Sequence, residues 1–414
     1  MRVLHLSWEY PPVLYGGLGR HVHALAETQA AAGHEVVVVT QSAPGAPTES
    51  LVNGVRIVRV AHDAPFLPEA QGGFIAWCFG LNTALARGAM AVLRGWRPDV
   101  VHGHDWLVAQ AAVIVHEAFD VPFVVTVHAT EAGRHHGDLA TDQSWAIHST
   151  EWWVTGLADR VIVCSDYMRG QVAHLFDLAA SAVSVIPNGI DPASWRVSSR
   201  RRDQAKAEHG SPLVVFAGRL EREKGVQTLL DALPILRRTV PGVRVVVMGV
   251  GGAEAWLRER ARDRGVSASV RFTGWVPEAD LRATVAAADA AVVPSLYEPF
   301  GFVALEAMVL GAPVVVARTG GLAEIVDAGR TGWCFEPGDP QALADELAAV
   351  LANRAEAQRR ARAARREVRE RYGWPAIAAQ TDRAYAAASV AMAATHARPA
   401  YAPRAGNLLH PDAR

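Results

Sequence analysis

The chain alternates short apolar runs with longer helical segments, in two successive series. The first series contains VLHLS, EVVVVT, VRIVRV, DVVHGH, PFVVTVH, DRVIVCS and VSVIPNGID, and the second contains LVVFAG, VRVVVMG, SVRFTG, AAVVPS, APVVVA and TGWCFE. A run such as EVVVVT, apolar throughout and bounded by turn residues, is typical of a strand that is buried on both faces. Strands that alternate with helices indicate a parallel, doubly wound sheet. The sequence therefore predicts an α/β fold with two Rossmann-like domains.

The two series meet near residue 195, and a chain of 414 residues is too long for one ordinary core. We assign residues 1–194 to an N-terminal domain and residues 195–374 to a C-terminal domain. The polar segment SSRRRDQAKAEHGSP lacks apolar periodicity and is interpreted as a linker. Residues 339–372 and the segment after Pro375 are predicted to be helical. Residues 397–414, rich in Pro, Ala and Arg, are predicted to be a disordered tail.

The composition is that of a soluble globular protein, with a formal net charge of −1. This balance does not favour a nucleic-acid-binding surface. Cys78, Cys164 and Cys334 lie far apart and match no metal-ligand spacing, which indicates a reduced, cytoplasmic protein without a disulfide framework. Because no apolar run approaches the length of a membrane span, neither a signal peptide nor a transmembrane segment is expected.

Glycines and cations gather where predicted strands end, which is where ligands bind in open α/β sheets. Gly16 and Gly17 precede a helix, whose N-terminal N–H groups can receive a phosphate. In FAGRLEREKG, Arg219 and Lys224 follow a buried strand, and Lys224 is one of only two lysines in the chain. A guanidinium and an ammonium group at that position suit a diphosphate that leaves with negative charge. A solvated charge cluster is the alternative interpretation of this segment.

The stretch SLYEPFGFVALEAMVLGAPVV contains two glutamates, Glu298 and Glu306, in otherwise apolar surroundings. Burying an unpaired carboxylate is costly, so we expect both to have partners. Glu298 precedes Pro299 and belongs to a loop, whereas Glu306 lies about two turns further, inside a helix. A glycosidase would place two carboxylates on either side of one bond. Here the neighbouring glycines and cations favour a ligand that bears phosphate, with the carboxylates accepting hydrogen bonds from sugar hydroxyls.

Histidines also occur at strand ends. His128 ends the run TVH, and His104 and Asp105 end an equivalent strand. Each imidazole could bind a polar ligand or serve a structural role, and the sequence leaves both open. His135 and His136 lack a convincing third ligand, so we expect no metal site. The run MGVGG does not spell GxGxxG, which disfavours a nicotinamide oxidoreductase.

These motifs follow the order found in one enzyme family. WEYPPVLYGGLG, VHGHDW, TVHAT, VIPNGID, FAGRLEREKG, PSLYEPFGFVALEAMVLGAPVV and TGGLAEIV resemble the retaining glycosyltransferases of family 4, in particular the glycogen-synthase-like branch. The resemblance extends to about residue 390. It implies the GT-B fold, in which two Rossmann-like, doubly wound parallel-sheet domains face each other across a cleft. It also implies that a helix at about residues 375–390 crosses back to the first domain.

The resemblance implies that a nucleotide-diphosphate sugar binds in this cleft. Glu306 would contact the ribose, and Glu298 the transferred sugar. Arg219 and Lys224 would hold the diphosphate, and His128 would lie near the reacting centre. The remaining nucleotide-sugar contacts are assigned to Gly16, Gly17, Asn188, Phe300, Gly301 and Phe302. The acceptor side is assigned to Glu9, His104, Asp105, Thr130, Glu131 and Arg134.

The implied function is transfer of a sugar, glucose in this branch, from the nucleotide sugar to a saccharide such as an α-glucan. In such enzymes the leaving phosphate is thought to take the acceptor's proton, so catalysis relies on positioning and electrostatic stabilisation. The chain has no Asp-x-Asp triplet, and we expect neither a metal nor another cofactor. Leu14 stands where related starch synthases carry lysine, which argues against importing their ADP-glucose preference.

Two alternatives stay open. One is transfer of mannose or N-acetylglucosamine to a small polyol, a lipid or a natural product. The other is a catalytically silent protein that only binds a nucleotide sugar. The sequence does not specify the donor base, the linkage or the oligomeric state.

Overall fold

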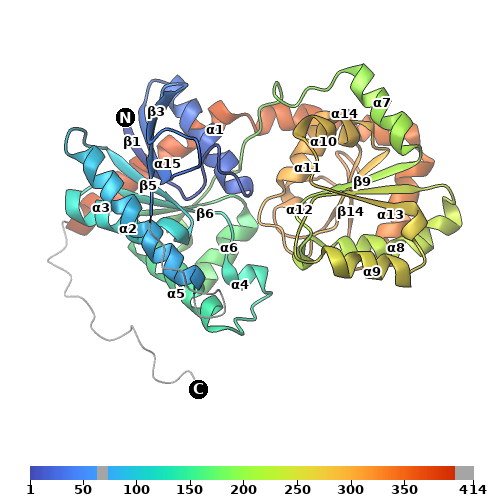
Figure 1. Ribbon diagram of the computed structural model, residues 1–414, viewed down its shortest axis with the longest axis horizontal. Coiled ribbons are helices and arrows are strands. Elements are labelled where there is room, and N and C mark those ends of the chain that lie inside the picture. Colours follow the sequence, from blue (N-terminus) through green and yellow to red (C-terminus); the bar gives the residue numbers. More distant parts are fainter. Residues whose placement is uncertain (63–72, 397–414) are drawn as a thin grey trace.

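The computed structural model describes residues 1–62 and 73–396. It contains two α/β units side by side, each with a central sheet between helices (Figure 1). Within the described residues, the first sheet has eight strands and the second has six. The predicted α/β fold with two parallel-sheet units is therefore confirmed. The predicted tail, residues 397–414, lies outside the described residues.

The first sheet has the order β3-β4-β2-β1-β5-β6-β7-β8. Its strands are β1 (Arg2–Leu6), β2 (Glu35–Gln41), β3 (Glu49–Val52), β4 (Val55–Val60), β5 (Val100–His104), β6 (Phe123–Val127), β7 (Arg160–Val163) and β8 (Val183–Val185). Among these described strands only β3 runs antiparallel to its neighbour. The sequence analysis missed β3, an edge strand whose side chains are mostly exposed. The turn before β4 is Asn53-Gly54, and both residues have positive φ, as a tight hairpin requires.

The second sheet has the order β11-β10-β9-β12-β13-β14, and the described strands pair in parallel. Its strands are β9 (Leu213–Ala217), β10 (Arg244–Met248), β11 (Val270–Gly274), β12 (Ala290–Val293), β13 (Val314–Ala317) and β14 (Trp333–Phe335). β9, β12 and β13 are buried along their whole length. This burial explains why their sequences are continuous apolar runs.

Helices cover the faces of both sheets (Figure 1). The first unit contains α1 (Gly17–Ala31), α2 (Gly73–Leu93), η2 (Trp106–Val108), α3 (Ala109–Phe119), α4 (Glu131–Arg134), α5 (Asp142–Leu157), α6 (Asp166–Leu175) and η3 (Ala180–Ala182). The second contains α7 (Ser199–His209), η4 (Arg222–Lys224), α8 (Val226–Thr239), α9 (Glu254–Asp263), η5 (Ser267–Ser269), α10 (Glu278–Ala287), α11 (Phe302–Leu310), α12 (Leu322–Ile325), α13 (Pro340–Ala352) and α14 (Arg354–Arg371).

The segment interpreted as a linker forms helix α7, so that interpretation is wrong. Only Ala205 of this helix is buried, and the sequence therefore shows no apolar stripe. The helix is held by polar contacts instead. The Ser198 hydroxyl caps its first turn by accepting the N–H of Arg201. Lys206 Nζ lies 2.5 Å from the Asp289 carboxylate and 3.1 Å from the carbonyl oxygen of Ala287.

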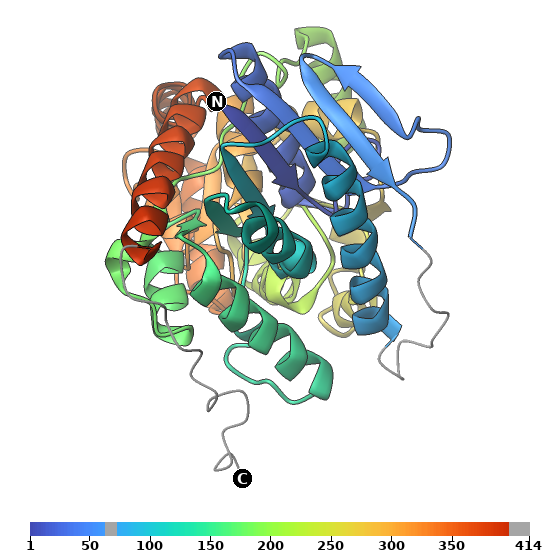
Figure 2. The ribbon, with the colours of Figure 1, turned by 90° about the vertical axis from the view of Figure 1, so that its left-hand side faces the viewer.

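The last helix, α15 (Trp374–His396), runs back from the second unit onto the first. In Figure 2 it lies beside the N-terminal strand, in red. Ile377 and Tyr385 of α15 belong to one buried cluster with Val3, Leu25 and Val124 of the first unit. The two units are therefore joined by a packed helix as well as by the chain between β8 and α7.

Helix α2 is the one described helix that is long and apolar enough to cross a membrane by length and composition. Leu81, Leu85 and Ala89 on its inner face belong to the core cluster that includes Leu4 and Val39 of the sheet. We therefore describe it as a core helix.

Candidate active site

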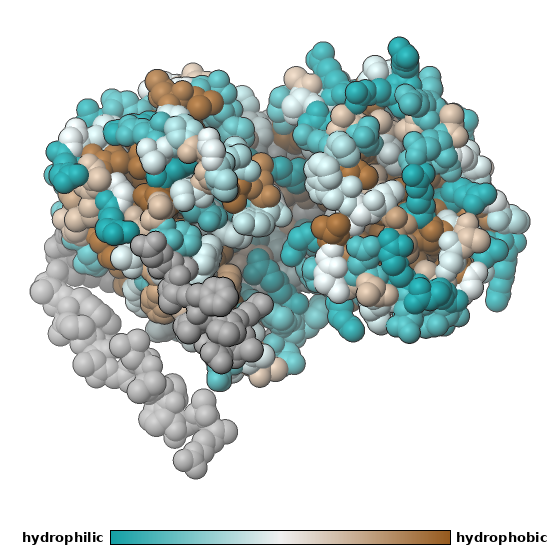
Figure 3. Space-filling model, viewed as in Figure 1, coloured by the Kyte–Doolittle hydropathy of each residue, from teal (hydrophilic) through white to brown (hydrophobic). Residues whose placement is uncertain are grey.

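A cleft of about 500 Å³ lies between the two units. Figure 3 shows the surface hollowed between the two halves of the molecule. Loops from the carboxyl ends of both sheets line it, as expected for ligand sites in α/β folds. Of the residues singled out in the sequence, the cleft brings together Glu9, Gly16, Gly17, Asp105, His128, Arg134, Asn188, Arg219, Lys224, Glu298, Phe300 and Phe302.

Lys224 lies at the end of η4, where the chain turns sharply into α8. The turn residue, Gly225, has a φ of 70°, and a Cβ there would approach the carbonyl oxygen of Pro294 to 1.8 Å. This close approach places Lys224 against the loop before α11. Lys224 Nζ lies 2.9 Å from Glu298 Oε2. The result is an ammonium group and a carboxylate held together at the wall of the cleft.

Arg219 follows β9 at the same wall. Its Nη2 lies 3.3 Å from Oε1 of Glu223, and its side chain is 58% exposed. The Glu223 side chain is only 18% exposed, whereas the guanidinium is open to solvent. The guanidinium can therefore also contact an anionic ligand in the cleft.

Each of the two glutamates in SLYEPFGFVALEAMVLGAPVV has a partner, which confirms the expectation for buried carboxylates. Glu298 lies in a loop and pairs with Lys224, whereas Glu306 lies within α11. Glu306 Oε1 is 2.5 Å from Arg20 Nη1 of helix α1, so this pair joins the two units. Burial raises the pKa of Glu306 and the Arg20 charge opposes this shift. Glu306 does not line the cleft but a second cavity of about 590 Å³, which shares Phe302 with it.

The glycine loop before α1 is held by Glu9. One oxygen of this carboxylate accepts the N–H groups of Tyr15 and Gly16, at 2.8 and 3.0 Å. Glu9 was assigned to the acceptor side, and in the structure it organises this loop. Gly17 lies against the Phe302 ring, where a Cβ would come within 2.7 Å of a ring atom. A larger residue at Gly17 would force the Phe302 ring to move.

His128 follows β6 and faces the cleft from the first unit. Asp105 Oδ1 accepts its backbone N–H at 2.6 Å. Asp105 has a φ of 60°, an uncommon conformation that turns the chain sharply after β5. Burial raises the pKa of Asp105 to about 6, and the nearby Arg134 opposes this shift. Burial lowers the pKa of His128 to about 3, so its imidazole is neutral at physiological pH.

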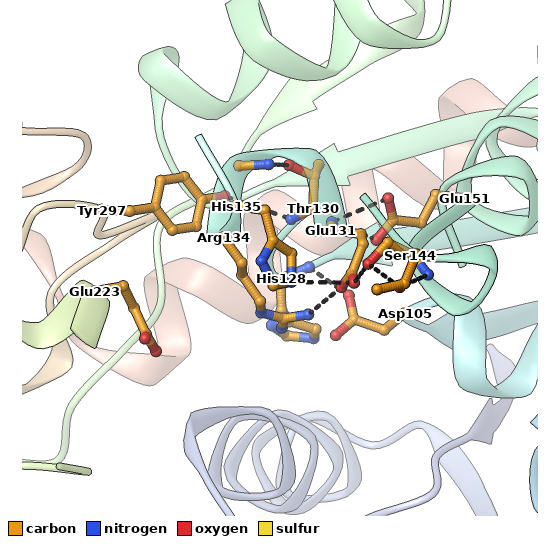
Figure 4. A network of polar contacts seen from close by, with 12 residues as sticks. Asp105, His128, Thr130, Glu131, Arg134, His135, Ser144, Glu151, Glu223 and Tyr297 are labelled. Atoms are coloured by element: carbon orange, nitrogen blue, oxygen red, sulfur yellow. Dashed lines mark hydrogen bonds and ion pairs between the residues drawn. The ribbon is translucent and has the colours of Figure 1, made fainter. Parts of the chain in front are cut away.

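Three residues assigned to the acceptor side are buried and are not among those that line the cleft. His104 lies beneath His128. The Thr130 hydroxyl caps α4 by accepting the N–H of Gly133, and the Glu131 carboxylate accepts the Ser144 hydroxyl at 3.0 Å. Figure 4 shows Thr130, Glu131 and Ser144 together with Arg134, which does line the cleft.

Glu151 of helix α5 binds Glu131, a member of this network. Both of its carboxylate oxygens accept the backbone N–H of Glu131, at 2.9 and 3.1 Å. Burial raises the pKa of Glu151 to about 8, although that N–H favours the ionised form. The folded protein therefore holds a proton on Glu151 that the unfolded chain releases above its ordinary pKa of 4.5.

We expect the Glu151→Gln variant to change how stability depends on pH. In the wild type, Glu151 contributes stability that falls as pH rises from 4.5 to about 8 and is constant above that range. As pH rises from 4.5 to about 8, the melting temperature of the variant should therefore increase relative to that of the wild type. Calorimetry of both proteins from pH 5 to 9 isolates this group, since other titrations cancel in the difference. A difference that does not vary with pH would contradict the assignment.

The sequence analysis missed three residues of the site. Glu223 lines the cleft from the second unit, opposite Arg134 (Figure 4). Tyr297 also lines it, and its hydroxyl lies 3.0 Å from Gln171 Oε1. Arg20 is the partner of Glu306. Tyr297 adjoins Glu298 and could have been noticed, but no local pattern points to Arg20.

The described residues include two groups of three histidines whose ring nitrogens lie within 4.8 Å of one another. They are His5, His102 and His104, and His21, His104 and His128. From the sequence, only His135 and His136 were considered as metal ligands, and neither belongs to these groups. His135 Nε2 instead lies 3.2 Å from Glu131 Oε1.

The two facing units and the cleft with cations on one wall define the architecture of a GT-B glycosyltransferase. Residues 15–194 match the model of the family described as Glycosyltransferase Family 4, and residues 198–367 match that of Glycosyl transferases group 1. A solved structure of sucrose-phosphate synthase from Thermosynechococcus elongatus superposes with a TM-score of 0.80 at 25% identity, covering 94% of this chain and 99% of the other.

Two curated proteins extend this comparison. The chain is 42% identical to a glycogen synthase of Mycobacterium tuberculosis (strain CDC 1551 / Oshkosh), over 94% of this chain and 95% of the other. It is 31% identical to an alpha-maltose-1-phosphate synthase of Mycolicibacterium smegmatis, over 92% and 98%. The chain belongs to the family 4 glycosyltransferases and is a nucleotide-sugar-dependent enzyme that acts on saccharides.

Proposed function

We propose that the protein transfers a glucosyl group from a nucleoside diphosphate glucose to an α-glucan or a small α-glucoside, with retention of configuration. The carrying observation is the composition of the cleft. Arg219 and Lys224 supply positive charge for the diphosphate, and Glu298 beside Lys224 can accept sugar hydroxyls. His128 faces them from the other unit. The 42% identity to a glycogen synthase supports glucose and glucan as the substrates.

Retention is supported by the state of the carboxylates in the cleft. Among the described residues, four carboxylates line it, and each already has a partner. Glu9 accepts backbone N–H groups of the glycine loop, and Asp105 accepts that of His128. Glu223 and Glu298 pair with Arg219 and Lys224. None is left free as a nucleophile or as a general base, which favours a mechanism in which the leaving phosphate takes the proton of the acceptor hydroxyl.

In this mechanism the protein's residues position the donor and stabilise charge. Lys224 and Arg219 offset the negative charge that grows on the diphosphate as the glycosidic bond breaks. Glu298 orients the sugar through its hydroxyls, and closure of the cleft holds the acceptor against the reacting carbon. A hinge near residues 190–197 and 372–374 is part of this proposal.

A second candidate acceptor is a small sugar phosphate. One relative is named alpha-maltose-1-phosphate synthase, and this name describes an enzyme that makes a phosphorylated disaccharide. Arg134 lines the cleft on the acceptor side with its side chain 38% exposed. This guanidinium could pair with a phosphate on the acceptor.

The test is release of nucleotide from UDP-, ADP- and GDP-glucose and from nucleotide donors of mannose and N-acetylglucosamine, each alone, with glycogen, with maltodextrins or with glucose 1-phosphate. Release that rises with a glucan supports the proposal and names the base. Release that rises only with glucose 1-phosphate supports the second candidate. Release only from mannose or N-acetylglucosamine donors would show that the transferred sugar is not glucose. No release from any donor would indicate a silent binding protein.

We also propose that the reaction needs no metal, since two cations already face the diphosphate position. Turnover should be unchanged after dialysis against EDTA. Loss of turnover that Mg²⁺ or Mn²⁺ restores would contradict this. A cytoplasmic location is also part of the proposal, supported by three buried cysteines that form no disulfide among the described residues.

A further inference from the structure

A chain of buried side chains leads from helix α1 to the cleft. Gln29 Oε1 lies 2.8 Å from His5 Nε2, and His5 Nδ1 lies 3.1 Å from His104 Nε2. His104 Nδ1 in turn lies 3.4 Å from His128 Nε2, the longest contact of the chain. The histidines come from β1, β5 and the end of β6, which are neighbours in the sheet. Only His128 reaches the cleft.

The three imidazoles are neutral in the folded protein. Burial lowers the pKa of His5 to about 4 and that of His128 to about 3, and it lowers the pKa of His104 well below its usual range. A neutral imidazole carries one N–H and one lone pair. In a hydrogen-bonded row of such rings, the group at one end therefore determines which nitrogen carries the proton in every ring.

Gln29 is that group. Its amide nitrogen donates to the hydroxyl of Tyr385 at 3.2 Å, which leaves its oxygen to accept from His5 Nε2. His5 Nδ1 is then an acceptor, and His104 must donate to it from Nε2. His104 Nδ1 is an acceptor in turn, for the Nε2–H of His128.

We propose that Gln29, acting through His5 and His104, is a positioning residue that holds His128 in the Nε2–H form, with the Nδ1 lone pair available to the ligand. His128 can then accept a hydrogen bond from a sugar hydroxyl and cannot donate one. Reversing the Gln29 amide would reverse each bond in the row and turn His128 Nδ1 into a donor. The nature of the ligand rests on the proposed function, whereas the protonation of His128 does not.

A second row beside the first provides a matched control. His102 Nδ1 lies 2.8 Å from the Tyr385 hydroxyl, and His102 Nε2 lies 2.7 Å from Oγ1 of Thr126. This row ends at Thr126, which is buried and does not line the cleft. Thr126→Val removes the partner of His102 at the end away from the Tyr385 hydroxyl, which the two rows share, and it leaves the three bonds from Gln29 to His128 in place.

The experiment is ¹⁵N NMR of the full chain with labelled histidine, which distinguishes protonated from bare ring nitrogens. The His128 signals are assigned by their loss in a His128→Gln spectrum. In the wild type we expect a proton on Nε2 of His128 and none on Nδ1. A proton on Nδ1 would overturn the proposal, and this result needs no variant of the row.

Gln29→Met removes the acceptor while keeping the length of the side chain. His5 would then carry an unsatisfied buried donor, which is costly, so its proton should move to Nδ1. The row reverses, and His128 should gain a proton on Nδ1. Thr126→Val should leave the His128 signals as in the wild type. Unchanged signals in Gln29→Met, or equal changes in both variants, would overturn the proposal.

Activity gives a separate readout. With the glucose donor that the nucleotide-release assay identifies, Gln29→Met should lower kcat/KM about tenfold, the worth of roughly one hydrogen bond. Thr126→Val should keep the wild-type value. If no donor turns over, the proposed function fails while the spectra still decide the protonation of His128. One equivalent of Zn²⁺ retained by the wild type and lost in His21→Gln would overturn the proposal, since the metal would take the lone pair of His104.

Discussion

Replacing Lys224 with alanine is expected to lower kcat by about 10²- to 10³-fold, which corresponds to roughly 2.7–4 kcal/mol of lost transition-state stabilisation by analogy with an oxyanion donor. Lys224 is the cation that the turn at Gly225 fixes against Glu298. The charge that it offsets grows only as the diphosphate leaves, so the loss should fall on kcat more than on KM. Steady-state kinetics with a saturating acceptor measures both.

The chain contains a matched control for this variant. Lys206, the only other lysine, pairs with Asp289 at 2.5 Å and does not line the cleft. Lys206→Ala should therefore lower the melting temperature without changing kcat. Because Lys224→Ala also leaves Glu298 without its charged partner, circular dichroism must show that the variant is folded. A folded Lys224→Ala protein with wild-type kcat would remove Lys224 from the mechanism.

The second large effect is expected at Glu306. If this carboxylate accepts the ribose hydroxyls, Glu306→Ala should raise the Kd of the nucleoside diphosphate by about 10- to 100-fold, as expected for hydrogen bonds to a charged group. Isothermal titration calorimetry of UDP, ADP and GDP in the absence of acceptor measures this. Turnover at saturating donor should fall less than in Lys224→Ala.

The ion pair of Glu306 with Arg20 provides the control. This pair joins the two units, so losing it could weaken binding simply by loosening the cleft. Arg20→Ala breaks the same pair but leaves the carboxylate in place. We expect nucleotide affinity to be retained in Arg20→Ala and lost in Glu306→Ala. Equal losses in the two variants would show that the ion pair, rather than a ribose contact, explains the effect.

The helices and strands that could be predicted from the sequence are those whose burial produces an apolar run or an apolar stripe. β2 is apolar because both faces of the first sheet are covered, and its run could be recognised without the structure. α7 and β3 have mostly exposed side chains, so their sequences show no stripe and no apolar run. The Asn53-Gly54 turn was a usable signal for β3. Helix α7 depends on Lys206 and Asp289, which meet only after folding.

The same limit applies to the site. The need of Glu298 and Glu306 for partners followed from the cost of burying charge, and both partners exist. Their identity did not follow, because Arg20 lies 286 residues from Glu306 in the chain. The family resemblance also placed Thr130 and Glu131 on the acceptor side. In the structure, Thr130 instead caps α4 and Glu131 binds Ser144. Of this segment, Arg134 reaches the cleft.

The most direct test of retaining glucosyl transfer to a glucan is the configuration of the product. The enzyme is supplied with its nucleotide donor carrying ¹³C-labelled glucose, together with maltodextrin, and the anomeric carbon of the product is followed by NMR. The account predicts that the label enters the glucan with α configuration, the same as in the donor. Label that enters with β configuration would contradict retention, and label recovered only as free glucose would contradict transfer to a glucan.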